Sequence, residues 1–356
     1  MTSPKLCVIC GGKSSEHNVS LVSTKNIIAA LNKKKYQLSL IGITLDGKWK
    51  LLDPAKPFVN SESTATISIN LTGRDIFIRR KDDQVFIIDD SNGRVIDSID
   101  ILFPVMHGAF GEDGTIQGLF RSWELPFVGC DILGSALCMD KDLTKRVLRD
   151  SDIPVAKWVT LRKYDDIPDF QSIVGELGLP VFIKPANAGS SVGVSKVNSE
   201  SEYWQSIEEA FRHDEKILIE EACIGKEVEC AILGNSHPKA SPIGEIVPTE
   251  NFYDFDTKYL NLTGASLKIP AEINDRIAQK IQDTAIKAFK LLECKGLSRV
   301  DFFLKPDDSF VLNEVNTLPG FTATSMYPSL WAHAGLSYSD LLDKIIELAV
   351  ERYENR

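Results

Sequence analysis

The sequence predicts an α/β domain built on a parallel sheet, followed by a longer region of α+β structure. An apolar run at 5–9 ends at Gly11-Gly12, a helical pattern covers 20–31, and a second strand-like run covers 37–44. This strand–turn–helix–strand order is a βαβ unit, which implies a parallel sheet. From Pro180 onward the mixture of predicted strands and helices is typical of α+β structure.

The remaining elements follow from local patterns. Short alternating apolar runs between 50 and 100, with turns such as Ser91-Asn92-Gly93, predict β-hairpins added to the first sheet. In order along the chain we then expect a strand at 99–105, helices at 115–123 and 140–149, strands at 180–184 and 192–197, a helix at 199–212, strands at 216–220 and 227–233, a helix at 271–292, strands at 298–304 and 310–315, and a helix at 338–353. A chain of 356 residues corresponds to two or three domains at roughly 100–200 residues each.

Composition narrows the class of protein. Hydrophobic residues make up 43% of the chain and charged residues 25%, as in ordinary globular proteins. The net charge of −10 and the lack of a basic run longer than 33–35 argue against a nucleic-acid partner, although local lysines can hold phosphates in an acidic protein. Without a signal-like segment or an apolar run of ~20 residues, we expect a cytoplasmic protein with no membrane partner.

The seven cysteines do not form a convincing site. Cys7 and Cys10 make a CxxC, but it lies inside a strand-like run and no second CxxC or histidine pair accompanies it. Buried, reduced thiols are therefore favoured over a zinc or redox site.

The segment 180–194 is a candidate phosphate site. A strand-like run delivers Lys184, and a loop of small residues with Gly189, Ser190 and Ser191 precedes the next strand. A lysine at a strand end suits phosphate oxygens, and glycine and serine let backbone N–H groups approach an anion closely. An ordinary Gly/Ser hairpin loop is the alternative interpretation.

Two strands joined by a turn at 306–309 predict a hairpin with a metal site. Because side chains two apart on a strand share a face, Arg299 lies beside Asp301, and Glu314 beside Asn316. A register near the turn brings Asp301 opposite or diagonal to Glu314. Carboxylates and a carboxamide beside phosphates suit Mg²⁺, whereas a solvent-facing polar hairpin is the alternative. The other face is expected to carry Val300, Phe302, Leu304, Val311, Asn313 and Val315.

Two further segments are candidates for the rest of a nucleotide site. The apolar strand and polar hinge at 217–227 predict an adenosine slot in which Glu227 accepts ribose hydroxyls, with a surface acidic run as the alternative. The segment 250–260 contains Tyr253, Lys258 and Tyr259. It predicts a lid that keeps water from a reacting centre, rather than a plain surface loop.

Two glycine turns fall at predicted strand ends, where open α/β sheets place ligands. Gly11-Gly12 is followed by Glu16, and the second turn, at 107–118, begins with His107. Glu16 is suited to hold a ligand ammonium group, whereas a histidine such as His107 more often caps or packs locally. Neither turn is a G-x-G-x-x-G fingerprint, which argues against an NAD-dependent dehydrogenase.

The order of these motifs is more specific than any one of them. The chain contains, in order, Gly-Gly-Lys-Ser-Ser-Glu-His, His-Gly-x-x-Gly-Glu-Asp-Gly-Thr-Ile-Gln-Gly, Met-Asp-Lys, Lys-Pro-x-x-x-Gly-Ser-Ser-Val-Gly-Val-Ser, Phe-Tyr-Asp-x-x-x-Lys-Tyr, Arg-x-Asp and Asn-Glu-x-Asn-Thr-x-Pro-Gly. This series resembles the D-alanine–D-alanine ligase family of the ATP-grasp superfamily over nearly the whole chain. The resemblance implies three domains: a Rossmann-like substrate domain at 1–130, a central ATP-grasp domain at 131–220, and a C-terminal ATP-grasp domain with the metal site and lid at 221–356.

The resemblance also implies roles for individual residues. ATP would be bound by Lys141, Lys184, Ser190, Ser191, Glu220, Glu221, Cys223, Glu227 and Lys258, with Cys223 acting through its backbone. Two Mg²⁺ ions, or Mn²⁺, would be held by Asp301, Glu314 and Asn316. The amino-acid substrates would contact Glu16, His107, Tyr253, Tyr259, Arg299, Gly320 and Ser325. Catalytic roles would fall to Glu16, Ser191, Tyr259, Arg299 and Ser325.

The implied activity is the ATP-dependent joining of two D-alanines through a D-alanyl phosphate, for peptidoglycan precursors, by a homodimer. Tyr259 favours an amine nucleophile, because family members that use D-lactate tend to carry Phe at the matching position. A ligase with D-lactate or D-serine as second substrate is the near alternative. A non-catalytic ATP-binding regulator is disfavoured, because both phosphate lysines and all three metal ligands are present.

Overall fold

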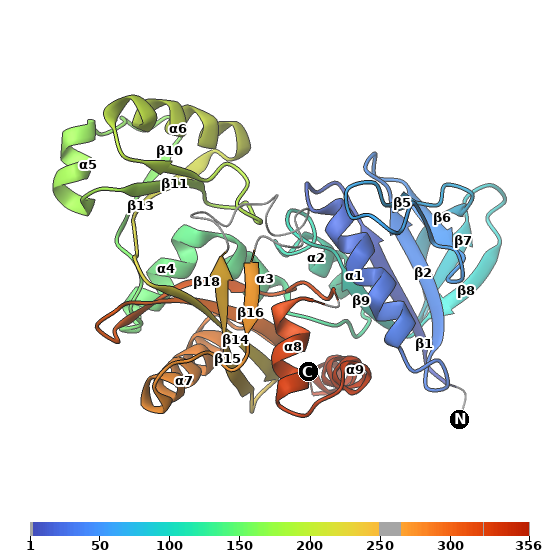
Figure 1. The fold of residues 1–356 in the computed structure, drawn as a ribbon. Coiled ribbons are helices and arrows are strands. Elements are labelled where there is room, and N and C mark those ends of the chain that lie inside the picture. Colours follow the sequence, from blue (N-terminus) through green and yellow to red (C-terminus); the bar gives the residue numbers. More distant parts are fainter. Residues whose placement is uncertain (1–2, 249–264, 323, 356) are drawn as a thin grey trace.

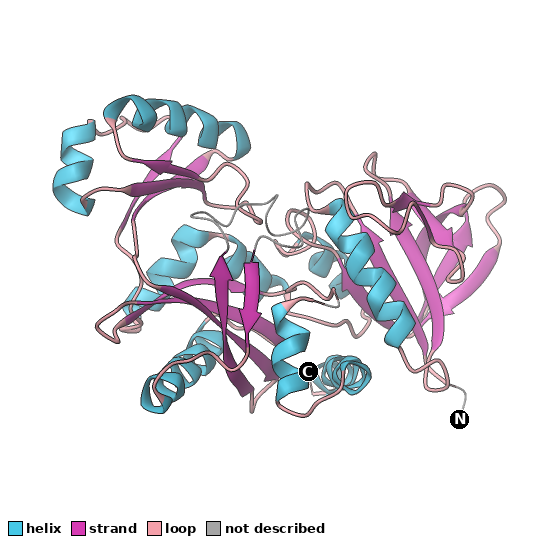
Figure 2. Cartoon of the chain, in the orientation of Figure 1, coloured by secondary structure: helices cyan, strands magenta, loops and turns pink. Residues whose placement is uncertain are grey.

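The computed structural model describes residues 3–248, 265–322 and 324–355. The strands in these segments form three main sheets of seven, four and five strands and one two-stranded ribbon. Figure 1 shows the first sheet beside the other two, which lie one above the other, and Figure 2 shows helices packed on each of them. The predicted combination of a parallel-containing sheet with α+β structure is confirmed. None of the described helices is long and apolar enough to cross a membrane.

The first sheet contains the predicted βαβ unit. Its elements are β1 (Lys5–Gly11), α1 (His17–Ala30), β2 (Gln37–Ile43) and β9 (Ile101–Val105), with β1 parallel to both of its neighbours. Cys10 packs in the core on the α1 side, whereas Cys7 belongs to the core on the opposite face. The two thiols of the CxxC therefore point to opposite sides of the sheet, because alternate side chains of a strand face opposite ways.

The hairpins predicted between 50 and 100 are confirmed as antiparallel additions to this sheet. They comprise β3 (Trp49–Leu52), β6 (Arg74–Lys81), β7 (Gln84–Asp89) and β8 (Val95–Ile99), with β4 (Phe58–Val59) and β5 (Ser68–Ile69) forming the separate ribbon. The strand predicted at 99–105 is confirmed as β9, although it begins only at Ile101 because Ile99 is the last residue of β8. The helix α2 (Thr115–Ser122) follows close to its predicted position.

The central sheet is antiparallel, in the order β10-β13-β11-β12. Its strands are β10 (Trp158–Arg162), β11 (Val181–Pro185), β12 (Ser195–Val197) and β13 (Lys216–Glu221). The helices α3 (Ile132–Met139) and α4 (Lys141–Asp150) precede the sheet in the chain, and α5 (Phe170–Leu177) and α6 (Glu200–His213) connect its strands. Both α5 and α6 contribute to its core, through residues such as Ile173 and Ile207. The strand predicted at 192–197 begins only at Ser195, so the preceding residues belong to the loop after β11.

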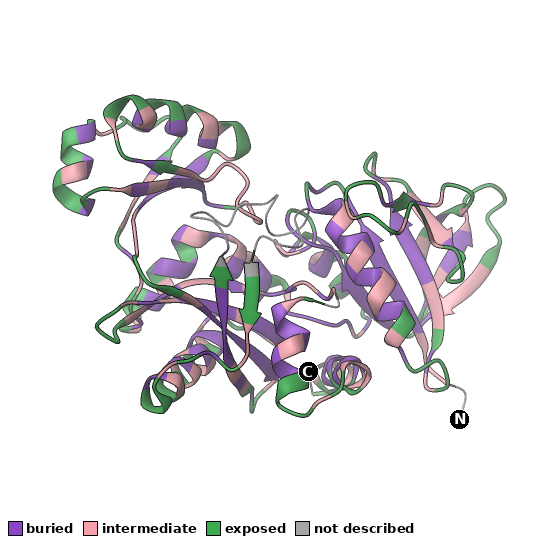
Figure 3. Cartoon of the chain, in the orientation of Figure 1, coloured by how far each residue is buried: buried purple, intermediate pink, exposed green. Residues whose placement is uncertain are grey.

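The carboxy-terminal sheet has the order β16-β15-β14-β17-β18. Its elements are β14 (Lys226–Gly234), β15 (Lys239–Pro248), β16 (Ala265–Lys268), α7 (Asp275–Leu291), β17 (Gly296–Leu304), β18 (Phe310–Asn316), α8 (Met326–His333) and α9 (Tyr338–Glu354). One face packs on α7 and the other on α8 and α9, and Figure 3 shows the strands largely buried between these helices. Residues of α9 also join the core beneath α1, which ties this body to the first sheet.

Several elements were not predicted: α3, α5, β10, β15, β16 and α8. The β15 segment carries Pro242 and ends at Pro248, and proline normally argues against a strand that is paired on both sides. Helix α8 contains Pro328, which is tolerated because it lies in the first helical turn. The domain limits at 130 and 220 stay a prediction.

Candidate active site

The hairpin β17–β18 places the predicted metal ligands on one face. Asp301 lies opposite Glu314, which is one of the two positions predicted for it, and Arg299 lies opposite Asn316. A register shift after Asp301 then pairs Phe302 with Leu312. This bulge corrects the predicted apolar face, because Leu312 fills the core beside Phe302 and Asn313 instead lines a pocket.

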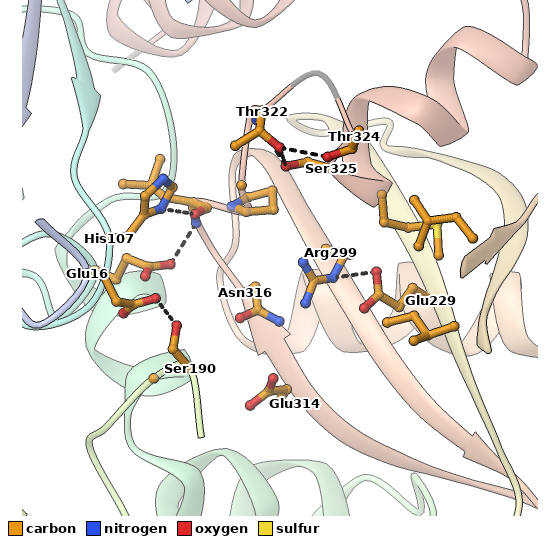
Figure 4. Close-up of a pocket in the computed structure, with 18 residues that line it drawn as sticks. Glu16, His107, Ser190, Glu229, Arg299, Glu314, Asn316, Thr322, Thr324 and Ser325 are labelled. Carbon is orange, nitrogen blue, oxygen red and sulfur yellow. Dashed lines mark hydrogen bonds and ion pairs between the residues drawn. The ribbon is translucent and has the colours of Figure 1, made fainter. Parts of the chain in front are cut away.

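Arg299 is held by two carboxylates, one from Asp301 on its own strand β17 and one from Glu229 on the neighbouring strand β14. Its Nε donates to Asp301 Oδ1 at 2.8 Å and its Nη2 to Asp301 Oδ2 at 2.7 Å, and Nε also lies 2.9 Å from Glu229 Oε2. Burial disfavours the charged guanidinium, but Asp301 and Glu229 outweigh this effect and raise the pKa of Arg299 well above its ordinary value. Arg299 therefore presents a fixed positive charge to the pocket in Figure 4. No motif in the sequence marks Glu229, which lies within the strand predicted at 227–233.

Three lysines surround the start of the phosphate loop. Lys184 Nζ at the end of β11 lies 3.1 Å from Glu220, and Lys145 Nζ on α4 lies 2.9 Å from the same carboxylate. Lys141 Nζ donates to the carbonyl of Ala188 at 2.5 Å. Burial disfavours ionisation of Glu220, but the two lysines overcome it and lower the pKa of this carboxyl. Lys141 and Lys145 occupy the same side of α4, four residues apart, which brings both to this site.

A cavity of about 270 Å³ contains most of the predicted nucleotide residues. Its walls include Lys141, Lys184, Ser190, Ser191, Glu220, Glu221, Cys223, Glu227, Phe182, Phe303 and Glu314. Glu221 Oε1 accepts a hydrogen bond from the backbone N–H of Lys157, which holds this part of the hinge in place. The walls therefore combine lysine cations with phenylalanine rings, a composition suited to phosphates and a planar base.

A second cavity, of about 150 Å³, lies between the first sheet and the carboxy-terminal sheet and is drawn in Figure 4. Predicted substrate residues on its walls are Glu16, His107, Arg299, Gly320 and Ser325. Glu16 reaches across to a hydrogen bond with the hydroxyl of Ser190. Ser191, which the family resemblance marked as catalytic, lines the nucleotide cavity instead.

Glu16 lies in a slot between two glycines. A Cβ atom at Gly108 would approach Glu16 Oε2 to 2.4 Å, and one at Gly189 would approach it to 2.8 Å. Gly108 also has a φ of +72°, a backbone conformation that favours glycine. The carboxylate position therefore depends on the absence of side chains on both sides.

His107 is buried and joins two parts of the molecule. Its Nδ1 donates to the carbonyl of Leu318 at 3.0 Å, and its Nε2 lies 3.1 Å from the hydroxyl of Ser23 on α1. Burial lowers the pKa of His107 to about 4, although the contact with Leu318 opposes this effect. The ring is therefore neutral at physiological pH, and it fixes the turn after β18 against the first sheet.

Glu112 lines the substrate cavity, although no role was predicted for it from the sequence. Its carboxylate accepts hydrogen bonds from the backbone N–H of Gly108 at 2.7 Å and of Leu318 at 3.1 Å. Burial, with the nearby charge of Glu16, raises the pKa of Glu112 to about 8. The Gly-Glu-Asp-Gly turn within the second motif was the only signal for it in the sequence.

A cluster of hydroxyl groups lies at the amino-terminal end of α8. The backbone N–H of Thr322 donates to Ser325 Oγ at 3.0 Å, and the hydroxyls of Thr322 and Ser325 lie 2.8 Å apart. Ser325 is the residue that immediately precedes α8. Helix amino-termini favour negative charge, so this wall of the pocket suits a carboxylate.

The structure brings most of the predicted site residues into two adjoining cavities. The lid residues Tyr253, Lys258 and Tyr259 lie outside the described residues. For the residues that are described, ligand and catalytic roles stay predictions.

Comparisons with known proteins show which family has this sequence and fold. One family model, described as D-ala D-ala ligase N-terminus, matches residues 5–130, and another, D-ala D-ala ligase C-terminus, matches residues 147–347. The D-alanine–D-alanine ligase of Shouchella clausii (strain KSM-K16) is 48% identical over 356 residues, which cover 99% of this chain and 96% of the relative.

Two solved structures have the same fold. The D-alanine-D-alanine ligase from Coxiella burnetii has a TM-score of 0.88 at 37% identity, and the match covers 100% of this chain and 96% of that one. The VanG D-Ala:D-Ser ligase from Enterococcus faecalis has a TM-score of 0.85 at 38% identity, over 98% of this chain and all (100%) of the other.

The chain has two antiparallel sheets and a lysine-lined cavity, and it shares its fold with these ligases. It is therefore an ATP-grasp ligase. More specifically, the chain belongs to the D-alanine–D-alanine ligase family.

Proposed function

We propose that this enzyme joins two molecules of D-alanine, converts ATP to ADP and phosphate, and forms D-alanyl phosphate as its intermediate. One observation carries the proposal. The nucleotide cavity and the substrate cavity share Gly189, Ser190 and Glu314 on their walls. A γ-phosphoryl group at this junction can reach a carboxylate in the second cavity without leaving the protein.

In the first step, a carboxylate oxygen of D-alanine attacks the γ-phosphorus of ATP, and the bond from that phosphorus to the β,γ-bridging oxygen breaks. Lys141 and Lys184 carry positive charge to the phosphate end of the nucleotide cavity. Serine hydroxyls and backbone N–H groups of the loop after β11 add hydrogen-bond donors. Such groups stabilise the charge that spreads over the phosphoryl oxygens.

The family implies Mg²⁺, and the residues present fit it. Asp301, Glu314 and Asn316 offer carboxylate and carboxamide oxygens from one hairpin, in which Glu314 and Asn316 line the substrate cavity and Asp301 lies opposite Glu314. These hard oxygen donors are the type that Mg²⁺ or Mn²⁺ takes together with substrate phosphates. A bound divalent ion there neutralises phosphate charge. Binding of two such ions by these three residues is part of the proposal.

In the second step, the amine of a second D-alanine attacks the acyl carbon, and the bond from this carbon to the phosphate oxygen breaks. Arg299 stabilises the oxyanion that forms at the acyl carbon. Glu16 holds the ammonium group of the first D-alanine, and the α8 amino-terminus with Ser325 receives the carboxylate of the second. The slot formed by Gly108 and Gly189 supports this role for Glu16, because it holds the carboxylate at the cavity wall.

The proposal extends to the cellular setting and to the lid. Membership of the family supports action in the cytoplasm, as a homodimer that supplies a dipeptide for peptidoglycan. Tyr259 would select an amine over the hydroxyl of D-lactate. D-serine remains the competing second substrate, because a structurally similar relative is named as a D-Ala:D-Ser ligase.

The test is ADP release from the purified enzyme with ATP and Mg²⁺. Separate reactions contain D-alanine, L-alanine, no amino acid, or D-alanine together with D-serine or D-lactate. Mass analysis of the product identifies the nucleophile. We expect ADP and D-alanyl-D-alanine in equal amounts only when D-alanine is present. ADP formation that does not depend on the amino acid would refute the proposal.

A further inference from the structure

Three acidic residues lie in a row across the carboxy-terminal sheet. The strands β14, β17 and β18 are neighbours, and their register aligns Glu229 with Asp301 and Asp301 with Glu314. Only the last two belong to the metal site proposed above. Neighbouring strands lie about 4.8 Å apart, so the Glu229 backbone is roughly 10 Å from that of Glu314. Glu229 and Glu314 therefore lie on opposite sides of Asp301.

Asp301 and Arg299 are in direct contact in this structure. The guanidinium uses both Asp301 oxygens, and the Asn316 amide donates to Oδ2 at 2.9 Å. A metal ion that takes Asp301 as a ligand must share or displace these contacts. The enzyme consequently needs a second anionic partner that keeps Arg299 in place when Asp301 turns to the metal.

Glu229 has the position and charge for this task. Glu229 is buried, with a side chain that is 3% exposed, and its Oε2 lies 2.9 Å from Arg299 Nε at the wall of the substrate cavity. Figure 4 shows Arg299 and Glu229 facing each other, with Asn316 and Glu314 on the other side of the arginine. We propose that Glu229 is a positioning residue that retains Arg299 and thereby releases Asp301 for the metal ion.

This inference rests on the proposed metal site and makes a directional prediction. In a Glu229→Gln variant, the amide attracts the guanidinium less strongly than a carboxylate does. Arg299 then pairs more tightly with Asp301 and competes with the metal. We expect the affinity for Mn²⁺, measured with ADP by the loss of the free-ion signal in electron paramagnetic resonance, to fall about fivefold, and the KM for D-alanine to rise more than that for ATP.

A double-mutant cycle separates this exchange from a general loss of negative charge. If Glu229 acts through Arg299, then Glu229→Gln will not weaken Mn²⁺ binding in an Arg299→Met background. Glu245→Gln is the matched control, because Glu245 is also buried, pairs with Lys226 at 3.0 Å, and lies on β15, one strand farther from Arg299. Glu229→Asp keeps the charge and is expected to retain Mn²⁺ affinity close to that of the unmodified enzyme.

Three outcomes would overturn the inference. The first is an unchanged Mn²⁺ affinity in Glu229→Gln, and the second is an equal loss of affinity when the same change is made in the Arg299→Met background. The third is the loss of one bound ion per chain in Glu229→Gln, because Glu229 would then be a metal ligand. Melting temperatures identify any variant that does not fold, and Glu229→Met, which also removes the charge, then takes the place of the glutamine variant. Failure of the unmodified enzyme to bind Mn²⁺ would instead count against the proposed metal site.

Discussion

Lys145 and Glu220 form an ion pair in the protein interior, with 2.9 Å between Nζ and Oε2 and side chains that are 1% and 5% exposed. Glu220 contacts Lys184 on its other side. Lys145 thus neutralises a carboxylate that would otherwise hold Lys184 strongly and keep it from ATP phosphates.

Replacing Lys145 by Met is expected to destabilise the protein by about 3 kcal/mol, because it leaves a buried charge with one fewer partner. It is also expected to raise the KM for ATP about tenfold while the KM for D-alanine changes little. The check is thermal unfolding together with initial rates. In the double variant Lys145→Met, Glu220→Gln, part of the lost stability should return, and a purely additive loss would contradict this account.

Replacing Gly108 by Ala is expected to reduce kcat/KM for D-alanine about 100-fold, because the new Cβ would displace the Glu16 carboxylate and small misplacements at a reacting site are costly. The matched control is Gly118→Ala. Gly118 lies in α2 with open space around its Cβ position, so alanine there is expected to stabilise the helix by about 0.5–1 kcal/mol. Steady-state kinetics of both variants provide the check, and equal kinetics in the two would count against the slot.

The two adjacent serines of the phosphate loop should behave differently. Ser190 donates to Glu16, whereas Ser191 lines the nucleotide cavity. Ser190→Ala is expected to lower kcat/KM for D-alanine roughly 10–100-fold, the size of a lost hydrogen bond to a charged group. Ser191→Ala is expected to change the KM for ATP instead. Parallel titrations of both substrates distinguish the two, and the opposite pattern would favour Ser191 as the residue that acts with Glu16.

Glu112 makes stability depend on pH. Its pKa is raised from 4.5 to about 8 by burial and by Glu16, so the folded state binds this proton more tightly than the unfolded chain. The sign follows from linkage: this contribution is present below the unfolded pKa and is lost as the pH rises toward 8. Glu112→Gln cannot lose a proton, so its melting temperature should rise relative to the unmodified protein between about pH 5 and pH 8. A constant difference across that range would show that Glu112 does not titrate there.

Much of the fold and of the site could be predicted because it depends on local pattern. The βαβ unit follows from apolar runs on either side of a helical segment. A short turn between two alternating strands predicts a hairpin that brings Asp301 opposite or diagonal to Glu314, and both signals are properties of a few consecutive residues. The exact pairing depends on the bulge after Asp301, because unbroken pairing from Leu304 and Phe310 would place Asn313, and not Glu314, opposite Asp301.

The sequence by itself determined the family, the order of the motifs, and the candidate ligands for phosphate and metal, since each motif lies within a short stretch of chain. Only the tertiary structure decided that Glu229 faces Arg299, that Lys145 rather than another lysine of α4 reaches Glu220, and that Glu16 lies between Gly108 and Gly189. The physical reason is that these contacts join segments far apart in the chain. Their partners are set by how sheets and helices pack, and residue type constrains that packing without specifying which charged groups will meet.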